Sequence, residues 1–213
     1  MKKVLITGGS GDIAKAIARS LRSIDGFEIQ MPGRDKMDVT DPVSVTQFIS
    51  HWSPDILINN AGYVVPESIG NGDIEIAKRT LDVNLFGTFN CADAALKYNP
   101  NVQIINIGSS AATKVHGTWS AYCAAKAAVV MATKCWAADG KQCICISPGR
   151  TATKMRKGLY PDEDQKTLMK ADDFAKIVVY AIWGYYTNGA HIDVNLSNVQ
   201  DLIAEHQADF RFR

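Results

Sequence analysis

Short apolar runs alternate with stretches of helical spacing along the whole chain. The apolar runs predict strands over residues 3–7, 27–31, 55–59, 102–108, 142–147 and 190–194. Between them, apolar residues three and four positions apart predict helices over 12–23, 42–51, 73–98, 118–138 and 171–186. This alternation predicts an α/β fold, in which a doubly wound, Rossmann-like parallel sheet carries helices on both faces.

The segment from residue 154 to residue 170 breaks the pattern. It is charged and contains Gly158 and Pro161, so we predict a loop or a lid there. A chain of 213 residues suits one compact unit, which buries roughly 70% of the surface of the unfolded chain. We therefore expect one domain over residues 1–195 and a C-terminal tail over 196–213 that contacts a substrate or another subunit.

Composition narrows the class of protein. The formal net charge of +1 gives no reason to expect a nucleic acid or a membrane as a partner. Because the chain passes from Lys2 and Lys3 directly into a predicted strand, we expect no signal peptide. The late apolar run IVVYAIW is too short to span a bilayer. The five cysteines lack paired CxxC spacing. We expect a cytoplasmic protein with reduced, mostly buried thiols and no metal site.

A glycine-rich turn joins the first predicted strand to the first predicted helix. Gly9, Gly11 and Ala14 fit the G-x-G-x-x-G/A pattern, in which the glycines close the turn and allow backbone to approach a pyrophosphate. The amides and the dipole of the helix N-terminus then face the phosphates. The alternative is a tight turn that binds no ligand.

Tyr122 and Lys126 lie four residues apart in a predicted helix, so their side chains share one face. A tyrosine has a pKa of about 10, and lowering it by about 3 units requires roughly 4 kcal/mol of preferential stabilisation of the phenolate. A neighbouring lysine supplies part of that stabilisation. The pair is therefore a candidate for proton transfer, and the alternative is an ordinary solvated helix face.

Several further motifs occur in an order that resembles the short-chain dehydrogenase/reductase family of the compact, single-domain type. The resemblance runs from Lys2 to about Asn195. Its motifs are TGGSGDIA at 7–14, NNAG at 59–62, Asn84 in DVNLFGTF, Ser109 thirteen residues before Tyr122, and SPGRTAT at 147–153. Asp12 and Ala14 depart from the pattern, because compact members usually carry glycine at both positions. Each motif taken alone also fits a turn or a solvated surface.

The resemblance implies an NAD(P)-dependent dehydrogenase or reductase that transfers hydride between a nicotinamide and a carbonyl or secondary alcohol. Tyr122 would be the acid and base, and Ser109 would hydrogen-bond the same substrate oxygen. Lys126 would lower the pKa of Tyr122 and hold the ribose, and Asn84 would hold a water that relays protons from Lys126. The catalytic residues implied are thus Asn84, Ser109, Tyr122 and Lys126.

The cofactor-binding residues implied, apart from Tyr122 and Lys126, are Thr7, Gly8, Gly9, Ser10, Gly11, Asp12, Ile13, Arg34, Asp38, Val39, Asn60, Ala61, Gly62, Pro148, Gly149, Thr151 and Thr153. Thr153 would bond the carboxamide, and Asp38 and Val39 would line the adenine. Arg34 follows the second strand, where a guanidinium suits the 2′-phosphate of NADP. NADP is therefore expected, with NAD possible, since Asp35 follows at once and Arg34 can also be read as a solvated loop residue.

Two other functions fit parts of the same sequence. One is a non-catalytic NAD(P)-binding sensor on this fold, and the other is a sugar-nucleotide epimerase or dehydratase, for which the chain after Thr153 is short. No motif identifies the small-molecule substrate. Residues 154–170, His116, Trp119 and the tail from Leu196 are the candidates for choosing it.

The predicted helix over 121–138 is apolar around most of its circumference, so it must be buried on more than one side. One side can cover the sheet and another can meet the preceding helix. We expect the remainder to meet a second subunit in a homodimer or homotetramer, as in the family that the chain resembles. The alternative is that neighbours in the same chain cover all of it.

Overall fold

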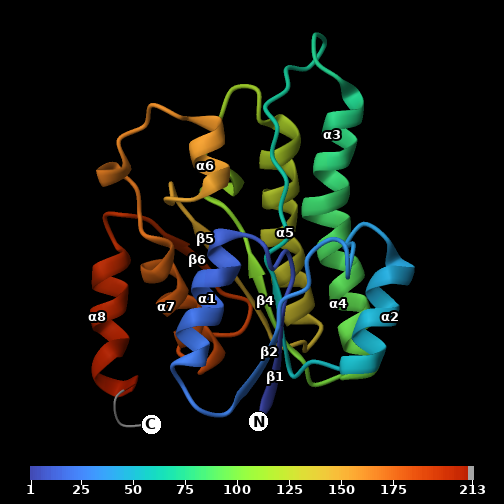
Figure 1. Cartoon of the computed structure of the whole chain (residues 1–213), viewed down its shortest axis with the longest axis vertical. Helices are drawn as coiled ribbons and strands as arrows, with labels where there is room; N and C mark the ends of the chain where they lie inside the picture. The colour runs from blue at the N-terminus through green and yellow to red at the C-terminus, as the bar shows by residue number, and fades with distance from the viewer. Residues whose placement is uncertain (211–213) are drawn as a thin grey trace.

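A parallel sheet of six strands, in the order β2-β1-β3-β4-β5-β6, forms the centre of the computed structural model (Figure 1). The structure describes residues 1–210. The strands are β1 (Lys2–Ile6), β2 (Phe27–Gln30), β3 (Ile56–Asn59), β4 (Gln103–Ile107), β5 (Cys143–Pro148) and β6 (His191–Val194). The predicted strands are confirmed, and so is the parallel sheet.

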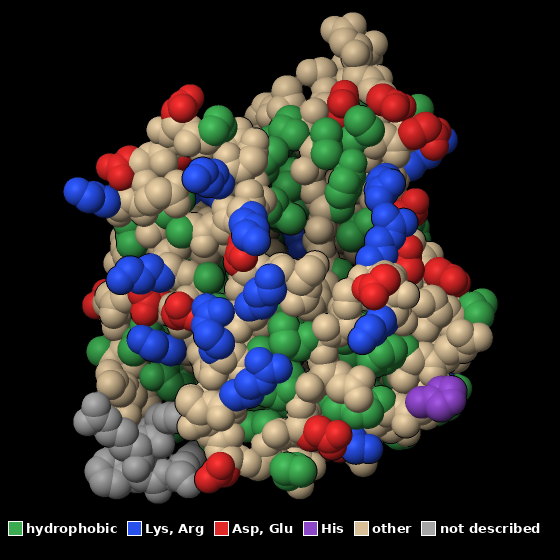
Figure 2. Space-filling model, viewed as in Figure 1, with side chains coloured by type: hydrophobic (Ala, Val, Ile, Leu, Met, Phe, Trp, Pro, Cys, Tyr) green, Lys and Arg blue, Asp and Glu red, His purple; other side chains and the backbone are tan. Residues whose placement is uncertain are grey.

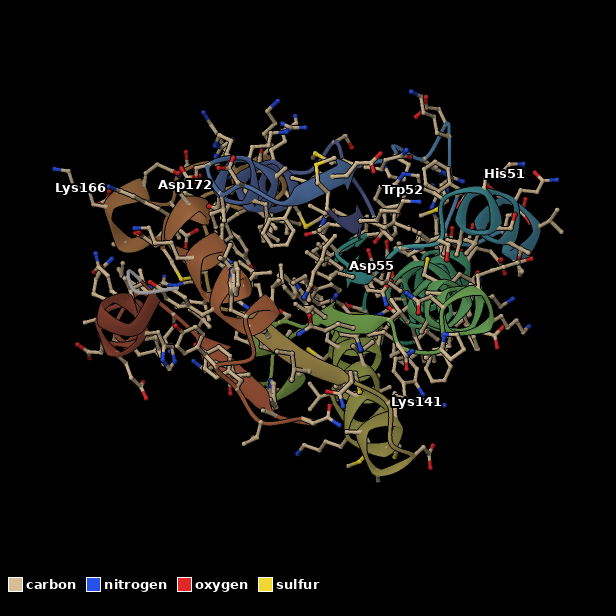
Figure 3. All side chains as sticks on the ribbon, turned by 90° about the horizontal axis from the view of Figure 1, so that it is seen from below. His51, Trp52, Asp55, Lys141, Lys166 and Asp172 are labelled. Carbon is tan, nitrogen blue, oxygen red and sulfur yellow. The ribbon has the colours of Figure 1, made fainter. Side chains whose placement is uncertain are left out.

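Helices cover both faces of the sheet, as Figure 3 shows from below. Their bounds are α1 (Asp12–Arg22), α2 (Pro42–Trp52), α3 (Ile74–Leu81), α4 (Gly87–Tyr98), α5 (Ser120–Ala138), α6 (Lys154–Leu159), α7 (Ala171–Ile182) and α8 (Val199–Phe210). Because side chains alternate along a strand, Ile6 of β1 packs with Ile17 of α1 and Phe174 of α7. Its neighbour Leu5 belongs to a second cluster, with Ile49 of α2 and Cys91 of α4.

The structure corrects two predicted segments and shows a helix within a third. The helix predicted over 73–98 is interrupted by a π-helical turn at Asp82–Phe86. The loop predicted over 154–170 contains α6, because the Thr153 hydroxyl accepts the backbone N–H of Arg156 and so caps a helix start. The tail predicted over 196–213 contains α8, whose Val199 and Ile203 are buried in the same core cluster as α7; its residues 211–213 lie outside the described part of the chain.

All strands point the same way, so the loops that follow them gather at one edge of the sheet. β1 pairs with β2 on one side and with β3 on the other, which is the point where doubly wound folds bind ligands. Residues 31–41 connect β2 to α2 without a helix or strand of their own. The loops after β1, β2 and β3 therefore meet at one place.

Candidate active site

A cavity of about 410 Å³ lies at this edge of the sheet. Most of the predicted site residues line it: Gly8, Ser10, Gly11, Asp12, Ile13, Arg34, Asp38, Val39, Asn60, Ala61, Gly62, Tyr122, Lys126, Pro148 and Thr153. Figure 2 shows apolar side chains gathered on the same face, between α6 and α3. The fold thus brings together segments that are more than 140 residues apart in the chain.

The glycine-rich turn packs against the two neighbouring loops without room for side chains. A Cβ on Gly8 would lie 2.8 Å from the Ala61 Cα, and one on Gly9 would lie 2.1 Å from the Met31 carbonyl oxygen. Gly8 also has a φ of +66°, which favours glycine. Gly11 is the N-cap of α1 and supplies no side chain to bond the first amides of the helix. Those amides remain directed at the cavity.

Thr7 supports the turn from behind and is not part of the cavity lining. Its Oγ1 accepts the backbone N–H groups of Asn60 and Ala61, each at 2.9 Å. The Asn60 side chain donates back to the Thr7 carbonyl at 3.0 Å. These bonds fix the end of β1 to the loop after β3, so Thr7 holds the cavity floor in place. Gly9 is also absent from the cavity lining, and its backbone packs closely against Met31.

Asp12 lines the cavity and forms a contact that the sequence did not predict. Its Oδ2 accepts the backbone N–H of Lys154 at 2.6 Å. Lys154 is the first residue of α6, directly after Thr153. The residue that departs from the family glycine therefore ties the nucleotide turn to the segment after β5.

Ser109, Tyr122 and Lys126 meet where β4 ends and α5 begins. The Lys126 Nζ donates to the Ile107 carbonyl at 2.9 Å and lies 5.8 Å from the centre of the Tyr122 ring. Lys126 is buried, and burial lowers the pKa of its ammonium to about 8. Ser109 lies close enough to the Tyr122 side chain to lower the pKa of its phenol, while the Ser109 Oγ accepts the backbone N–H of Ala111 at 3.1 Å.

The direction of the Tyr122 pKa differs from the sequence expectation. Burial raises the pKa of the phenol, and the influence of Ser109 offsets only part of that rise. Because burial outweighs the other influences, Tyr122 is protonated at neutral pH. This is the form in which a phenol can donate a proton.

Asn84 is fully buried in the π-helical turn. Its Nδ2 donates to the carbonyl oxygens of Tyr63 and Thr80, at 2.6 and 2.8 Å, and its Oδ1 accepts the Tyr63 N–H at 3.3 Å. The side chain therefore ties the loop after β3 to the helix pair α3–α4. The water relay expected at Asn84 stays a prediction.

Arg34 lies at the cavity rim, paired with Asp38. Its Nε donates to Asp38 Oδ2 at 2.8 Å, and 68% of the Arg34 side chain is exposed. Burial opposes ionisation of Asp38, but hydrogen bonds from Arg34 and Thr40 outweigh it and hold the pKa of the carboxyl below its usual value. Asp35 is not in the cavity lining, and its Oδ1 lies where a Cβ on Gly33 would stand. Arg34 therefore keeps an exposed guanidinium beside the cavity.

Only part of the loop after β5 lines the cavity. Pro148 and Thr153 line the cavity, whereas Gly149 and Thr151 are not part of its lining. Thr151 is buried, and its hydroxyl donates to the Gly149 carbonyl at 3.0 Å. A Cβ on Gly149 would approach the Asn195 Cβ to 3.0 Å. We read these two residues as shaping the loop.

Six lining residues were not identified by any motif: Met37, Tyr63, Arg79, Val83, Ile107 and Gly108. Lys154 and Met155, which also line the cavity, belong to the segment 154–170 that was named as a candidate for choosing the substrate. Arg79 stacks over the Tyr63 ring, with 5.1 Å between the guanidinium carbon and the ring centre. Arg79 and Val83 follow the ordinary spacing of a surface helix and carry no separate signal. Gly108 had a signal, because it stands at the end of an apolar strand; a Cβ there would lie 2.2 Å from Ser147 Oγ.

Comparisons with known proteins agree on one family. The model for the short chain dehydrogenase family matches residues 34–164. An uncharacterized oxidoreductase of Staphylococcus saprophyticus is 30% identical, over 91% of this chain and 94% of that protein. The 2,3-dihydro-2,3-dihydroxybenzoate dehydrogenase of Bacillus subtilis is 28% identical, over 86% of this chain and 89% of that protein.

Solved structures share the fold. A small-chain dehydrogenase in complex with NADPH has a TM-score of 0.82 and 24% identity, covering 91% of this chain and 96% of that one. A short chain dehydrogenase from Burkholderia cenocepacia in complex with NADP has a TM-score of 0.78 and 26% identity, with the same coverage. Within residues 1–210, no helix is long and apolar enough to cross a membrane.

Proposed function

Because this chain belongs to the short-chain dehydrogenase/reductase family, whose members are NAD(P)-dependent oxidoreductases, we propose that it moves hydride between NADP(H) and a carbonyl or secondary alcohol with Tyr122 as acid and base. One observation carries the proposal. Tyr122, whose phenol is influenced by Ser109 and whose ring lies next to the buried Lys126, is part of the wall of a cavity built at the switch point of the sheet.

The residues present fit a dinucleotide. Glycines stand where any Cβ would collide, and the uncapped amides at the start of α1 face the cavity, which suits a pyrophosphate. Asn60, Ala61 and Val39 would hold the adenosine half, and Lys126 and Thr153 the nicotinamide half. When bound, the nicotinamide supplies or accepts the hydride.

The proposed preference for NADP depends on Arg34. Its guanidinium is exposed at the rim of the cavity, directly after β2. A guanidinium binds phosphate oxygens in two parallel hydrogen bonds and keeps its charge at all relevant pH values. The related Burkholderia protein, solved with NADP, supports the same choice.

In the reductive direction, Tyr122 gives its proton to the developing alkoxide and Ser109 donates a hydrogen bond to the same oxygen. Both donors lie at fixed positions, so little reorganisation is needed as charge develops. Lys126 then returns a proton toward Tyr122, since its pKa of about 8 allows proton exchange near neutral pH. We assign Asn84 to the same relay through a water, beside its bonds to Tyr63 and Thr80.

The Tyr122→Phe variant tests the assignment. It removes the only group proposed to donate the proton, so turnover should fall by about 10²- to 10⁴-fold while cofactor affinity is kept. Turnover is followed at the nicotinamide absorbance against a panel of ketones, aldehydes and secondary alcohols, and binding by calorimetric titration. Tyr98→Phe, which removes an exposed hydroxyl at the end of α4, is the matched control. A Tyr122→Phe enzyme as active as the parent would exclude the proposal.

We also propose that the protein is a homodimer or homotetramer. Three large apolar side chains are between 41% and 60% exposed in the single chain. They are Phe86 at the end of the π-helical turn, Phe89 in α4 and Met131 in α5. Phe89 packs edge-on against Trp136 of α5, with 5.0 Å between ring centres. We propose that a second copy covers these exposed apolar residues of neighbouring helices.

A further inference from the structure

A second cavity, of about 240 Å³, shares Tyr122 with the first. Its other walls come from the loop before α3, from the first turns of α3, and from residues 118–121 at the start of α5. Tyr122, the proposed proton donor, is thus part of both linings. A molecule bound in the second cavity would lie beside Tyr122 without competing for the phosphate-binding turn.

The lining of this second cavity is mostly apolar. Its apolar side chains are Val65, Ile69, Ile74, Ala77, Trp119 and Ala121. Trp119 is 9% exposed and packs edge-on against Tyr122, with 5.5 Å between ring centres. The His116 ring lies against the Trp119 ring, with 5.1 Å between their centres. An indole held in this way beside the proton donor suits the flat, apolar face of a ring.

The charges that line the two cavities differ. The first cavity has four cationic residues in its lining, Arg34, Arg79, Lys126 and Lys154, and two carboxylates, Asp12 and Asp38. The lining of the second includes two carboxylates, Glu67 and Asp73, and no lysine, arginine or histidine. An anion in the second cavity would lose its hydration and meet like charges, whereas an uncharged molecule would not.

Both carboxylates are held in place by backbone bonds. Glu67 Oε2 accepts the Asp73 N–H at 3.2 Å, and Asp73 Oδ1 accepts the Glu75 N–H at 2.9 Å as the N-cap of α3. The Glu67 N–H donates to the Thr118 carbonyl at 2.7 Å. Thr118 has a φ of +64°, a strained conformation for a β-branched residue. This turn fixes the loop before α3 against the segment that carries Trp119.

We infer that the second cavity is the substrate cavity and that it selects an uncharged ring ketone, or the corresponding cyclic alcohol, over carboxylate-bearing analogues. Trp119 supplies the surface for the ring, and Glu67 and Asp73 reject anions. The inference rests on the proposed function for the chemistry at Tyr122, but it concerns which molecule is bound there.

Two ligands of the same shape test the role of charge: 4-oxocyclohexanecarboxamide, which is neutral, and 4-oxocyclohexanecarboxylate, which is ionised at pH 7. With NADPH, the wild-type kcat/KM should favour the carboxamide by about tenfold, the size of one interaction between like charges on the order of 12 Å apart near a protein surface. Glu67→Gln and Asp73→Asn keep the acceptor oxygens and should each lower this ratio about threefold. Glu75→Gln, which removes an exposed carboxylate outside the lining, should leave the ratio at its wild-type value.

Two ketones of equal carbon number test the role of Trp119. The wild type should prefer cyclohexanone to 2-hexanone, Trp119→Leu should remove most of that preference, and Trp119→Phe should restore it. Thermal unfolding of each variant reports whether the fold is kept. A preference unchanged in folded Trp119→Leu would overturn the ring assignment.

Direct binding separates this inference from the proposed function. The carboxamide and the carboxylate are titrated calorimetrically into the protein saturated with NADP⁺. Selective binding of the carboxamide without any turnover would support the cavity assignment and reject the proposed reaction. Equal binding or equal turnover of the two ligands, or binding of neither, would overturn the cavity assignment.

Discussion

The carboxylate of Asp12 accepts the backbone N–H of Lys154 at 2.6 Å and so joins the first turn of α1 to the first residue of α6. Thr153, the residue proposed to hold the carboxamide of the cofactor, directly precedes this contact. A glycine, which the family usually has at position 12, could not form it. The same carboxylate brings a negative charge to a cavity proposed to bind phosphates.

Substitutions at Asp12 can separate these two effects. Asp12→Asn keeps an oxygen that accepts the Lys154 N–H but removes the charge, so NADPH should bind several-fold more tightly. Asp12→Gly removes both, so the amides of residues 154–159 should exchange with deuterium faster than in the wild type. Exchange measured by mass spectrometry and cofactor titration check the two effects. Unchanged exchange in Asp12→Gly would show that the contact does not hold α6.

Replacing Arg34 should change the choice of cofactor. Arg34→Ala should weaken NADPH binding by roughly ten- to a hundred-fold and leave NADH almost unaffected, because a hydrogen bond to a charged group contributes about 1.5–3 kcal/mol. Lys36→Ala, which removes a nearby exposed cation outside the cavity lining, is the control. Equal weakening of both cofactors by Arg34→Ala would contradict the role given to Arg34.

Lys126 should make stability depend on pH in the alkaline range. Burial lowers its pKa from 10.5 to about 8, so between these values the unfolded chain binds a proton that the folded chain does not. Stability linked to this group therefore rises from pH 8 to pH 10.5 and is lost as the pH falls toward 8. Below pH 8, the buried Lys126 lowers the free energy of unfolding by about 3 kcal/mol relative to its value above pH 10.5.

The Lys126→Met variant isolates this effect, because it removes the buried ammonium. From pH 7 to pH 10, the free energy of unfolding of the wild type should rise relative to the variant by roughly 2 kcal/mol. Urea unfolding at several pH values measures it. Lys134→Met, which removes an exposed lysine from the same helix, should show no such trend. A pH-independent difference for Lys126→Met would mean that folding does not change the pKa of Lys126.

A charge on the exposed apolar surface of α4 and α5 should separate the subunits. In Met131→Lys, an ammonium would replace an apolar side chain that is 60% exposed in the single chain, so a second copy would have to desolvate it. Light scattering over a dilution series should then give a mass near 23.2 kDa for the variant and a multiple of it for the wild type. A wild type that is monomeric at every concentration, micromolar included, would end the oligomer proposal.

The local features of this protein follow from the sequence alone. Its strands are short apolar runs, and a parallel sheet covered on both faces needs such runs, so their positions could be predicted to within one residue at each end. The shared helix face of Tyr122 and Lys126 follows from a spacing of four residues. The glycine turn follows from its position between a strand and a helix.

Contacts between distant segments were decided by the tertiary structure. The Asp12–Lys154 bond joins residues 142 positions apart, and no local pattern encodes such a pairing. The direction of the Tyr122 pKa depends on burial, which spacing along a helix does not report. The same holds for the two cavities that share Tyr122, because their lining residues come from loops and helix ends that only the folded sheet brings to one edge.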